Sequence, residues 1–258
     1  MAKENNSTNL EKACDLLLIL SQSANPVSVA DLSTKLNVSR TTAYAMLASL
    51  QSRGFVERNA DGRYMNGYAL LRLADGYQRM YPFLPLAEAH MRTLARLWEQ
   101  SVMITVYKSP CHLVMLRSVS ELPQQVPIPR MSGVMNAMLV SGGRLLMATL
   151  TDEQLRADLD VGPMELLLPQ HPYDKEQMYQ EIIACRGARY VIERNEYSLG
   201  RGSIAAPVYD QQGTIIAAIC SPVDLTTLTP EMEQKLAMDI TTTAMRISAE
   251  IGYPVAII

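Results

Sequence analysis

Apolar residues recur every three or four positions in three separate runs near the start of the chain. The first run covers residues 10–22 and follows Thr8 and Glu11, which are spaced as a capping box. The second covers residues 28–37 and begins with a second capping pattern, Ser28 and Asp31. The third runs from Ser39, a favoured N-cap residue, to Gly54. This periodicity predicts three helices that are joined by very short connections.

The periodicity changes directly after the third predicted helix. Residues 55–65 contain two extended runs on either side of Asn59-Ala-Asp-Gly62, whose residues favour a tight turn. The sequence therefore predicts a small β-hairpin. Helix, short helix, helix and hairpin, in that order, are typical of a winged helix-turn-helix.

A second set of elements begins near residue 68. Apolar positions predict helices at 68–78 and 85–100, and further helices at 141–150 and 174–185. Extended runs predict strands at 102–109, 112–119, 124–131, 189–195, 203–210 and 213–223. A last helix has Thr229 as its cap, Pro230 at its first position and Gly252 as its stop. Strands with helices at both ends of the segment predict an α+β fold class.

The composition is that of an ordinary globular protein with about two domains. Of the 258 residues, 48% are hydrophobic and 19% are charged. No run approaches the ~18 apolar residues of a membrane span, and the N-terminus has no secretory pattern, so we expect a cytoplasmic protein without a membrane partner. The four cysteines are too scattered for a zinc site or a disulfide framework.

Charge is distributed unevenly along the chain, although the net charge is only −3. Residues 1–80 carry nine Lys and Arg against seven Asp and Glu, which leaves fourteen against nineteen in the rest. A mildly positive N-terminal part tolerates a polyanion such as DNA.

The predicted third helix is the candidate reading element. In a winged helix-turn-helix this helix enters the major groove, and its first residues face bases and phosphates. Arg is the commonest reader of guanine, and Ser and Thr bond phosphates or bases. The predicted DNA contacts are Ser28, Ser39, Arg40, Thr41, Thr42 and Tyr44, with Arg58 and Arg63 from the hairpin. The alternative is a capped surface helix with a solvated arginine and a purely structural hairpin.

Catalytic and cofactor chemistry has little support in the sequence. Residues 200–205 match the dinucleotide fingerprint by letter, but they lie between two predicted strands and open no helix. His90, His112 and His171 have no spaced ligand partners and no Ser-His-Asp arrangement. We therefore predict no catalytic residue, no metal site and no cofactor, and a protein that is not an enzyme.

Residues 10–74 resemble the N-terminal domain of the IclR family of bacterial transcriptional regulators. The shared features are an Ala- and Leu-rich first helix, the phrase VSVADLS, a Ser-led helix with Tyr-x-x-Leu-x-x-Leu spacing, and a hairpin with Gly-x-Tyr. Residues 202–223 and the last helix resemble the family's effector-binding domain. The resemblance implies a winged helix-turn-helix DNA-binding domain at 1–68, a helical linker at 69–84 and a GAF-like domain at 85–258 for effector binding and oligomerisation.

The resemblance also implies a small-molecule pocket in the GAF-like domain, usually for an organic or aromatic acid. A family phrase of the type Pro-Leu-His-Ala-Thr-Ala-x-Gly-Lys aligns with residues 133–144 after a one-residue shift, with Asn136 in place of the histidine. The implied pocket residues are Ile104, Met115, Met135, Asn136, Met138, Ser141, Glu193, Ser203, Cys220 and Ser221. Methionines suit a ligand with an apolar part. Glu193 would repel an acid unless it is hydrogen-bonded, or would hold a ligand hydroxyl or amine.

The sequence thus predicts a ligand-responsive transcriptional regulator that binds double-stranded DNA as a homodimer or tetramer. A symmetric assembly reads a near-palindromic operator, and the regulated genes would serve catabolism of a small organic or aromatic acid. Two alternatives stay open. One is an enzyme on a GAF-like domain with an N-terminal interaction module, and the other is a DNA-binding protein whose second domain serves only oligomerisation.

Overall fold

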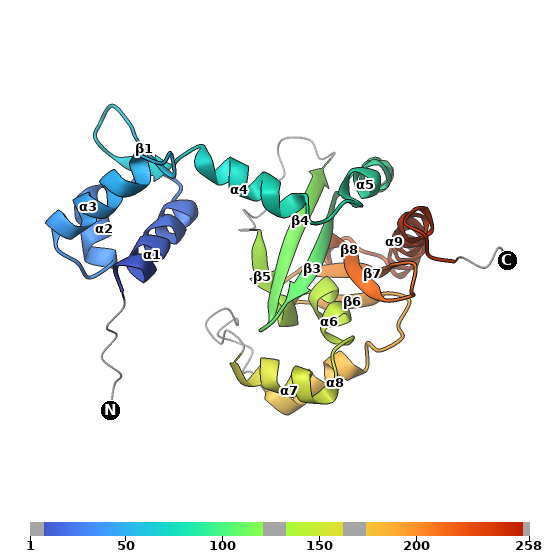
Figure 1. Ribbon diagram of the computed structural model, residues 1–258. Helices are drawn as coiled ribbons and strands as arrows, with labels where there is room; N and C mark the ends of the chain where they lie inside the picture. Colours follow the sequence, from blue (N-terminus) through green and yellow to red (C-terminus); the bar gives the residue numbers. More distant parts are fainter. Residues whose placement is uncertain (1–7, 121–132, 162–173, 255–258) are drawn as a thin grey trace. The chain divides into compact units, whose positions relative to one another are not determined.

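A computed structural model describes residues 8–120, 133–161 and 174–254 (Figure 1). The chain divides into two compact units, Met1–Tyr81 and Pro82–Ile258, and each is considered by itself. The strand predicted at 124–131 lies outside the described residues. All the other predicted helices and strands are present, with ends that differ by a few residues.

Three short helices begin the N-terminal unit. They are α1 (Asn9–Gln22), α2 (Val29–Lys35) and α3 (Arg40–Gln51). Each starts at a predicted cap, because the side-chain oxygens of Thr8, Ser28 and Ser39 accept hydrogen bonds from amides three residues further on. Thr8 and Glu11 form the complete capping box. Local capping therefore fixes where all three helices start.

The hairpin packs against these helices. It consists of β1 (Val56–Arg58) and β2 (Tyr64–Asn66), and α4 (Ala69–Gln78) follows it. Gly62 has a φ of 78° and donates its amide to the Asn59 carbonyl at 3.0 Å, which closes the turn with a backbone conformation that favours glycine. Val27 adds an isolated bridge to Tyr64. The small core comprises Leu16, Leu20, Val27, Leu32, Leu36, Met46, Leu47, Val56 and Tyr64.

The C-terminal unit is built around one antiparallel sheet. Its elements are α5 (Leu84–Trp98), β3 (Ser101–Lys108), β4 (His112–Ser120), β5 (Val134–Asn136), the 3-10 helix η1 (Ala137–Leu139), α6 (Ser141–Met147), α7 (Asp152–Val161), α8 (Lys175–Ile183), β6 (Val191–Arg194), β7 (Arg201–Tyr209), β8 (Ile215–Asp224) and α9 (Pro230–Glu250). The six strands are ordered β5-β4-β3-β8-β7-β6. The predicted α+β class is confirmed.

Helices cover both faces of this sheet (Figure 1). On one face α5 and α9 pack together, and Trp98 on α5 donates its indole N–H to Asp239 on α9 at 2.9 Å. On the other face lies α6, with α7 and α8 beyond it. Five buried methionines join the core of this second layer, namely Met103, Met135, Met138, Met147 and Met178.

Three elements were not predicted from the sequence. β5 and η1 are only three residues long, too short to show a period. α7 did have a signal, because Thr151 and Gln154 form a capping box: the Gln154 amide donates to Thr151 Oγ1 at 3.2 Å, and the Thr151 amide donates to Gln154 Oε1 at 3.1 Å.

A buried carboxylate ties α7 to the β3–β4 turn. Asp158 accepts hydrogen bonds from the Tyr107 hydroxyl and, at 2.7 Å, from the Ser109 hydroxyl. The Tyr107 oxygen in turn accepts the Cys111 amide at 2.9 Å. Burial raises the pKa of Tyr107 well above its ordinary value and that of Cys111 to about 12, so both groups keep their protons.

Loss of the Tyr107 hydroxyl should destabilise the C-terminal unit. In Tyr107→Phe the buried Asp158 carboxylate and the Cys111 amide each lose a partner, at a cost of about 1–3 kcal/mol. Urea unfolding followed by the fluorescence of Trp98, the one tryptophan, measures this change. The matched control is Tyr209→Phe, since the Tyr209 hydroxyl makes no hydrogen bond within the described residues. Equal stability of the two variants would refute the proposed contribution.

Candidate functional site

The exposed N-terminal end of α3 carries the first group of predicted site residues. Arg40, Thr41 and Tyr44 are exposed. Within the described part of the chain, their side chains have no hydrogen-bond or ion-pair partner. These three groups are available to an external ligand, and they project from consecutive turns of a helix whose opposite side is held by the buried Ala43, Met46 and Leu47.

Two of the predicted DNA contacts, Ser28 and Ser39, also serve as helix caps, and a third, Thr42, contacts one of these caps. Ser39 Oγ accepts the Thr42 amide at 3.0 Å and lies 2.8 Å from Thr42 Oγ1. Ser28 Oγ accepts the Asp31 amide at 3.2 Å and donates to Asp31 Oδ2 at 2.6 Å. The bond from Ser28 is the main reason that the pKa of the Asp31 carboxyl lies below its ordinary value. These hydroxyls therefore fix the backbone of the helix starts.

Both hairpin arginines contact other residues of the N-terminal unit. Arg58 donates its Nε to the Gly62 carbonyl at 3.2 Å, and its guanidinium lies 5.6 Å from the Tyr64 ring centroid. Arg63 donates its Nη1 to the Pro26 carbonyl at 3.4 Å. Both side chains remain exposed, so a phosphate would have to compete only with weak surface contacts.

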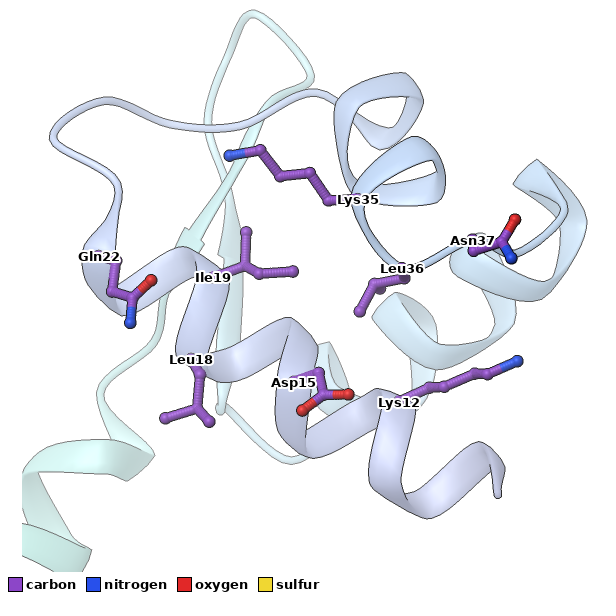
Figure 2. Close-up of a pocket in the computed structure, with 8 residues that line it drawn as sticks. All are labelled: Lys12, Asp15, Leu18, Ile19, Gln22, Lys35, Leu36 and Asn37. Atoms are coloured by element: carbon purple, nitrogen blue, oxygen red, sulfur yellow. The ribbon is translucent and has the colours of Figure 1, made fainter. Parts of the chain in front are cut away.

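A groove in the same unit lies apart from these residues (Figure 2). It runs between α1 and the end of α2, and it is lined by Lys12, Asp15, Leu18, Ile19, Gln22, Lys35, Leu36 and Asn37. None of the predicted DNA contacts lines it. Its rim carries charges of both signs, so it has no clear preference for an anion.

In the C-terminal unit, strand pairing brings most of the predicted pocket residues to one face. Paired residues on neighbouring strands point to the same side of a sheet. Cys220 pairs with Ala205, two positions from Ser203, and Ser203 pairs with Glu193. Gly142 on α6 lies against Cys220, so this is the face that α6 covers. The predicted residues gathered here are Met115, Met135, Met138, Ser141, Glu193, Ser203 and Cys220.

Two predicted pocket residues do not join this group. Ile104 pairs with Ile219, one position away from Cys220, so both lie on the face toward α5 and α9. Ser221 also lies there, and its hydroxyl contacts Gln100 Oε1 and the Ser101 carbonyl, each at 3.0 Å. Asn136 is buried beside the group, where its Oδ1 accepts the Met138 amide at 3.0 Å and caps η1.

A chain of hydrogen bonds links the polar members of the group. Ser203 Oγ accepts both the Ser141 amide, at 3.0 Å, and the Ser141 hydroxyl, at 2.8 Å. Ser203 Oγ then donates to Glu193 Oε2 at 3.2 Å, and the Glu196 amide donates to Glu193 Oε1 at 2.7 Å. The Ser141 amide, at the start of α6, is thus bonded within the protein.

Two neighbours of this group were missed. Thr105 Oγ1 lies 3.5 Å from Cys220 Sγ, and Gly142 is in contact with both side chains. The strand period could have found Thr105, because it points to the same face as Ala218 and Cys220. Burial raises the pKa of Cys220 to about 11, which keeps the thiol protonated at neutral pH.

Glu193 is the buried carboxyl of the group. Only 3% of the residue is exposed. Burial raises its pKa above the ordinary value of 4.5, and the Glu196 amide, the Ser203 hydroxyl and the charge of Arg144 act in the opposite direction. At a given pH the site therefore has less negative charge than the sequence suggests.

Replacement of Glu193 should change how stability depends on pH. Because its folded pKa is raised, the carboxyl contributes stability that is present below the unfolded value of 4.5 and is lost as pH rises through the folded value. Glu193→Gln should show a shallower decline in the free energy of unfolding from pH 4.5 upward, measured by urea unfolding and Trp98 fluorescence. The exposed Glu153→Gln serves as control. A decline equal to that of the wild type would count against this assignment.

Neither a metal centre nor a membrane span is found in the described ranges. No group of three or more His, Cys, Asp and Glu side chains gathers there in a way that could hold an ion. No helix among these residues is long and apolar enough to cross a membrane.

Two family models match the chain. Residues 9–60 match the IclR helix-turn-helix domain, and residues 81–249 match the Bacterial transcriptional regulator IclR C-terminal domain. The chain is 24% identical over 245 residues to the HTH-type transcriptional repressor AllR of Escherichia coli strain K12, covering 94% of this chain and 90% of AllR.

Solved structures share the fold over almost the whole length. The IclR of Thermotoga maritima is 22% identical with a TM-score of 0.73, covering 95% of this chain and 98% of that one. An IclR homolog from Microbacterium hydrocarbonoxydans, complexed with 4-hydroxybenzoate, is 20% identical with a TM-score of 0.76, covering 95% and 99%. These likenesses show that the fold of both units is shared with solved structures.

Proposed function

Since the chain belongs to the IclR family of bacterial transcriptional regulators, we propose that its α3 reads an operator while its C-terminal unit senses a small molecule. The matched families and relatives are transcriptional regulators, not enzymes, so the enzyme alternative is set aside. One observation carries the proposal: in a helix-turn-helix domain, the first turns of α3 expose Arg40, Thr41 and Tyr44, whose side chains have no partner among the described residues.

The proposed DNA contacts divide into two kinds. Base-reading candidates have side chains without a partner in the described residues, and backbone contacts have side chains that already bond within the protein. Arg40, Thr41 and Tyr44 are the base-reading candidates because their side chains are exposed and otherwise unengaged among the described residues. The capping hydroxyls of Ser28 and Ser39, and the Thr42 hydroxyl beside Ser39, lie at helix starts, where amides and hydroxyls bind phosphates. Arg58 and Arg63 are charge contacts to the backbone, since each already bonds a carbonyl of its own unit.

Selection of binding sites from random DNA by the full-length protein tests this function. A homodimer or tetramer with two-fold symmetry should enrich near-palindromic sites with half-sites about one or more helical turns apart. Residues 69–84, which include α4, would connect the reading and sensing units of each subunit. Failure to enrich any sequence at low salt would overturn the function. Because the proposed target is DNA, the expected compartment is the cytoplasm.

The effector would be a small organic or aromatic acid, and the regulated genes would serve its catabolism. The group of Met115, Met135 and Met138 supplies apolar contact, and Glu193 with Ser203 supplies polar atoms for a hydroxyl. The 4-hydroxybenzoate complex of the Microbacterium relative, an acid with a hydroxyl, supports this class. A ligand that binds only the folded state raises its melting temperature. A thermal-shift panel of organic acids should therefore give hits; a panel without hits would favour a domain that serves only oligomerisation.

A further inference from the structure

Arg144 on α6 is a buried cation that the proposed contacts do not use. Only 8% of the residue is exposed. Its Nε donates to the Met138 carbonyl of η1 at 2.7 Å, and its Nη1 lies 3.1 Å from Glu181 Oε2 on α8. Its Nη2 lies 3.4 Å from Glu196 Oε1, in the turn that joins β6 to β7. One side chain therefore touches three separate parts of the unit.

The contact to Glu196 is the weak one. Nη2 is buried, yet within the described residues it makes no hydrogen bond of good geometry, although the Glu196 carboxylate is within ion-pair distance. A buried donor that lacks a hydrogen bond is costly, whereas a charge-assisted bond of good geometry is strong. The turn is thus held by a contact that can be lost more easily than the bond to Met138.

Arg144 and Ser141 lie on the same side of α6. Residues three apart on a helix lie on one face, and both face the β6–β7 hairpin. Ser141 bonds Ser203, Ser203 bonds Glu193, Glu193 accepts the Glu196 amide, and Glu196 pairs with Arg144. These contacts form a closed circuit between α6 and the hairpin. A ligand that is to reach the polar atoms of Glu193 and Ser203 must open part of this circuit.

We propose that Arg144 is a positioning residue that sets how often this buried polar site opens. It holds η1, α8 and the β6–β7 turn around α6, so its loss should increase the open population. Apparent effector affinity equals the intrinsic affinity scaled by the fraction of competent protein, so a weaker hold should make effector binding tighter. This last consequence rests on the proposed function, but the opening itself does not.

Amide hydrogen exchange of the full-length protein without ligand tests the opening directly. The reporters are the Ser141 amide, bonded to Ser203, and the Glu196 amide, bonded to Glu193. Exchange of such amides follows the local opening equilibrium. Arg144→Met should speed exchange at both by about tenfold or more, as expected when charge-assisted bonds are lost. Arg144→Lys, which keeps the charge, should restore part of the protection.

Arg186 provides a matched control in the same unit. Like Arg144, it combines backbone and carboxylate partners: it donates to the carbonyls of Ala148 and Leu150 and to the carboxylate of Asp152. Among the described residues, no hydrogen bond or ion pair joins it to the β6–β7 turn. Arg186→Met should leave exchange at the Ser141 and Glu196 amides unchanged. Uniform acceleration over the whole unit in Arg144→Met, or no acceleration at the two amides, would overturn the proposal. Should Arg144→Met be unable to fold, Glu196→Gln must speed the Ser141 amide for the proposal to stand.

The two proposals fail in different ways. One outcome is that Arg144→Met speeds exchange at the Ser141 and Glu196 amides, while no acid of the panel binds the wild type or the variant. This outcome would leave the positioning role in place and contradict the effector function. The opposite outcome is that Arg144→Met leaves exchange at the two amides unchanged, while an acid raises the melting temperature of the wild type. This outcome would leave the effector function in place and contradict the positioning role.

Discussion

Arg40→Ala should weaken binding to the selected operator by about 1–3 kcal/mol and relax sequence preference at one position of each half-site. Arg40 lies at the first position of α3, is exposed, and has no partner within the described residues, so its truncation removes no internal contact. The folded protein should therefore keep its stability. Fluorescence anisotropy with operator and scrambled duplexes at several salt concentrations gives both the affinity and the discrimination.

Two further variants distinguish base recognition by Arg40 from the effect of its positive charge alone. Arg40→Lys keeps the positive charge but loses the planar fork that bonds guanine through two N–H groups, so discrimination should fall while the salt dependence stays nearly constant. Arg53→Ala removes the same charge just after the other end of α3, and it should leave discrimination intact. If Arg40→Ala and Arg53→Ala lower the affinity for both duplexes equally, Arg40 contacts only the backbone.

Much of the N-terminal unit could be predicted because its signals are local. Thr8, Ser28 and Ser39 each cap the helix that they were expected to cap, and the turn before Gly62 closes the expected hairpin. Capping and turn chemistry depend on residues three or four apart, which a single sequence contains in full. What the sequence could not supply is the side-chain bonding. Arg63 lies at the Pro26 carbonyl, a contact across 37 positions of the chain.

The proposed effector site was harder to predict because it depends on strand register. Cys220 and Ser221 were both expected in the pocket, yet adjacent residues of a strand point to opposite faces, so only one of them can be there. In the structure, Cys220 lies against Gly142 on the face that α6 covers, whereas the Ser221 hydroxyl donates to the Ser101 carbonyl on the opposite face. The family phrase at residues 133–144 likewise gave no sign that Arg144 would meet carboxylates from α8 and the β6–β7 turn.

Gly143→Ala should strongly destabilise the C-terminal unit, with a loss of about 3 kcal/mol or more. A Cβ at this position would overlap the carbonyl oxygen and the Cα of Ala137, which belong to the backbone of η1. Backbone cannot yield as the end of a flexible side chain can, so η1 or α6 must move. The gain of up to ~1 kcal/mol that alanine brings to a helix is too small to offset this clash. Urea unfolding followed by Trp98 fluorescence measures the loss.

Two other helical glycines make the test specific. Gly76→Ala on α4 meets only Arg79 Nη2, 3.9 Å away, so the same change should raise the thermal stability of the N-terminal unit slightly. Gly142→Ala meets the Cys220 thiol and Thr105, which are side chains, so its cost should be intermediate. A Gly143→Ala protein as stable as Gly142→Ala would mean that η1 yields easily. The η1 segment, which carries Met138, would then adjust to the added methyl group at low cost.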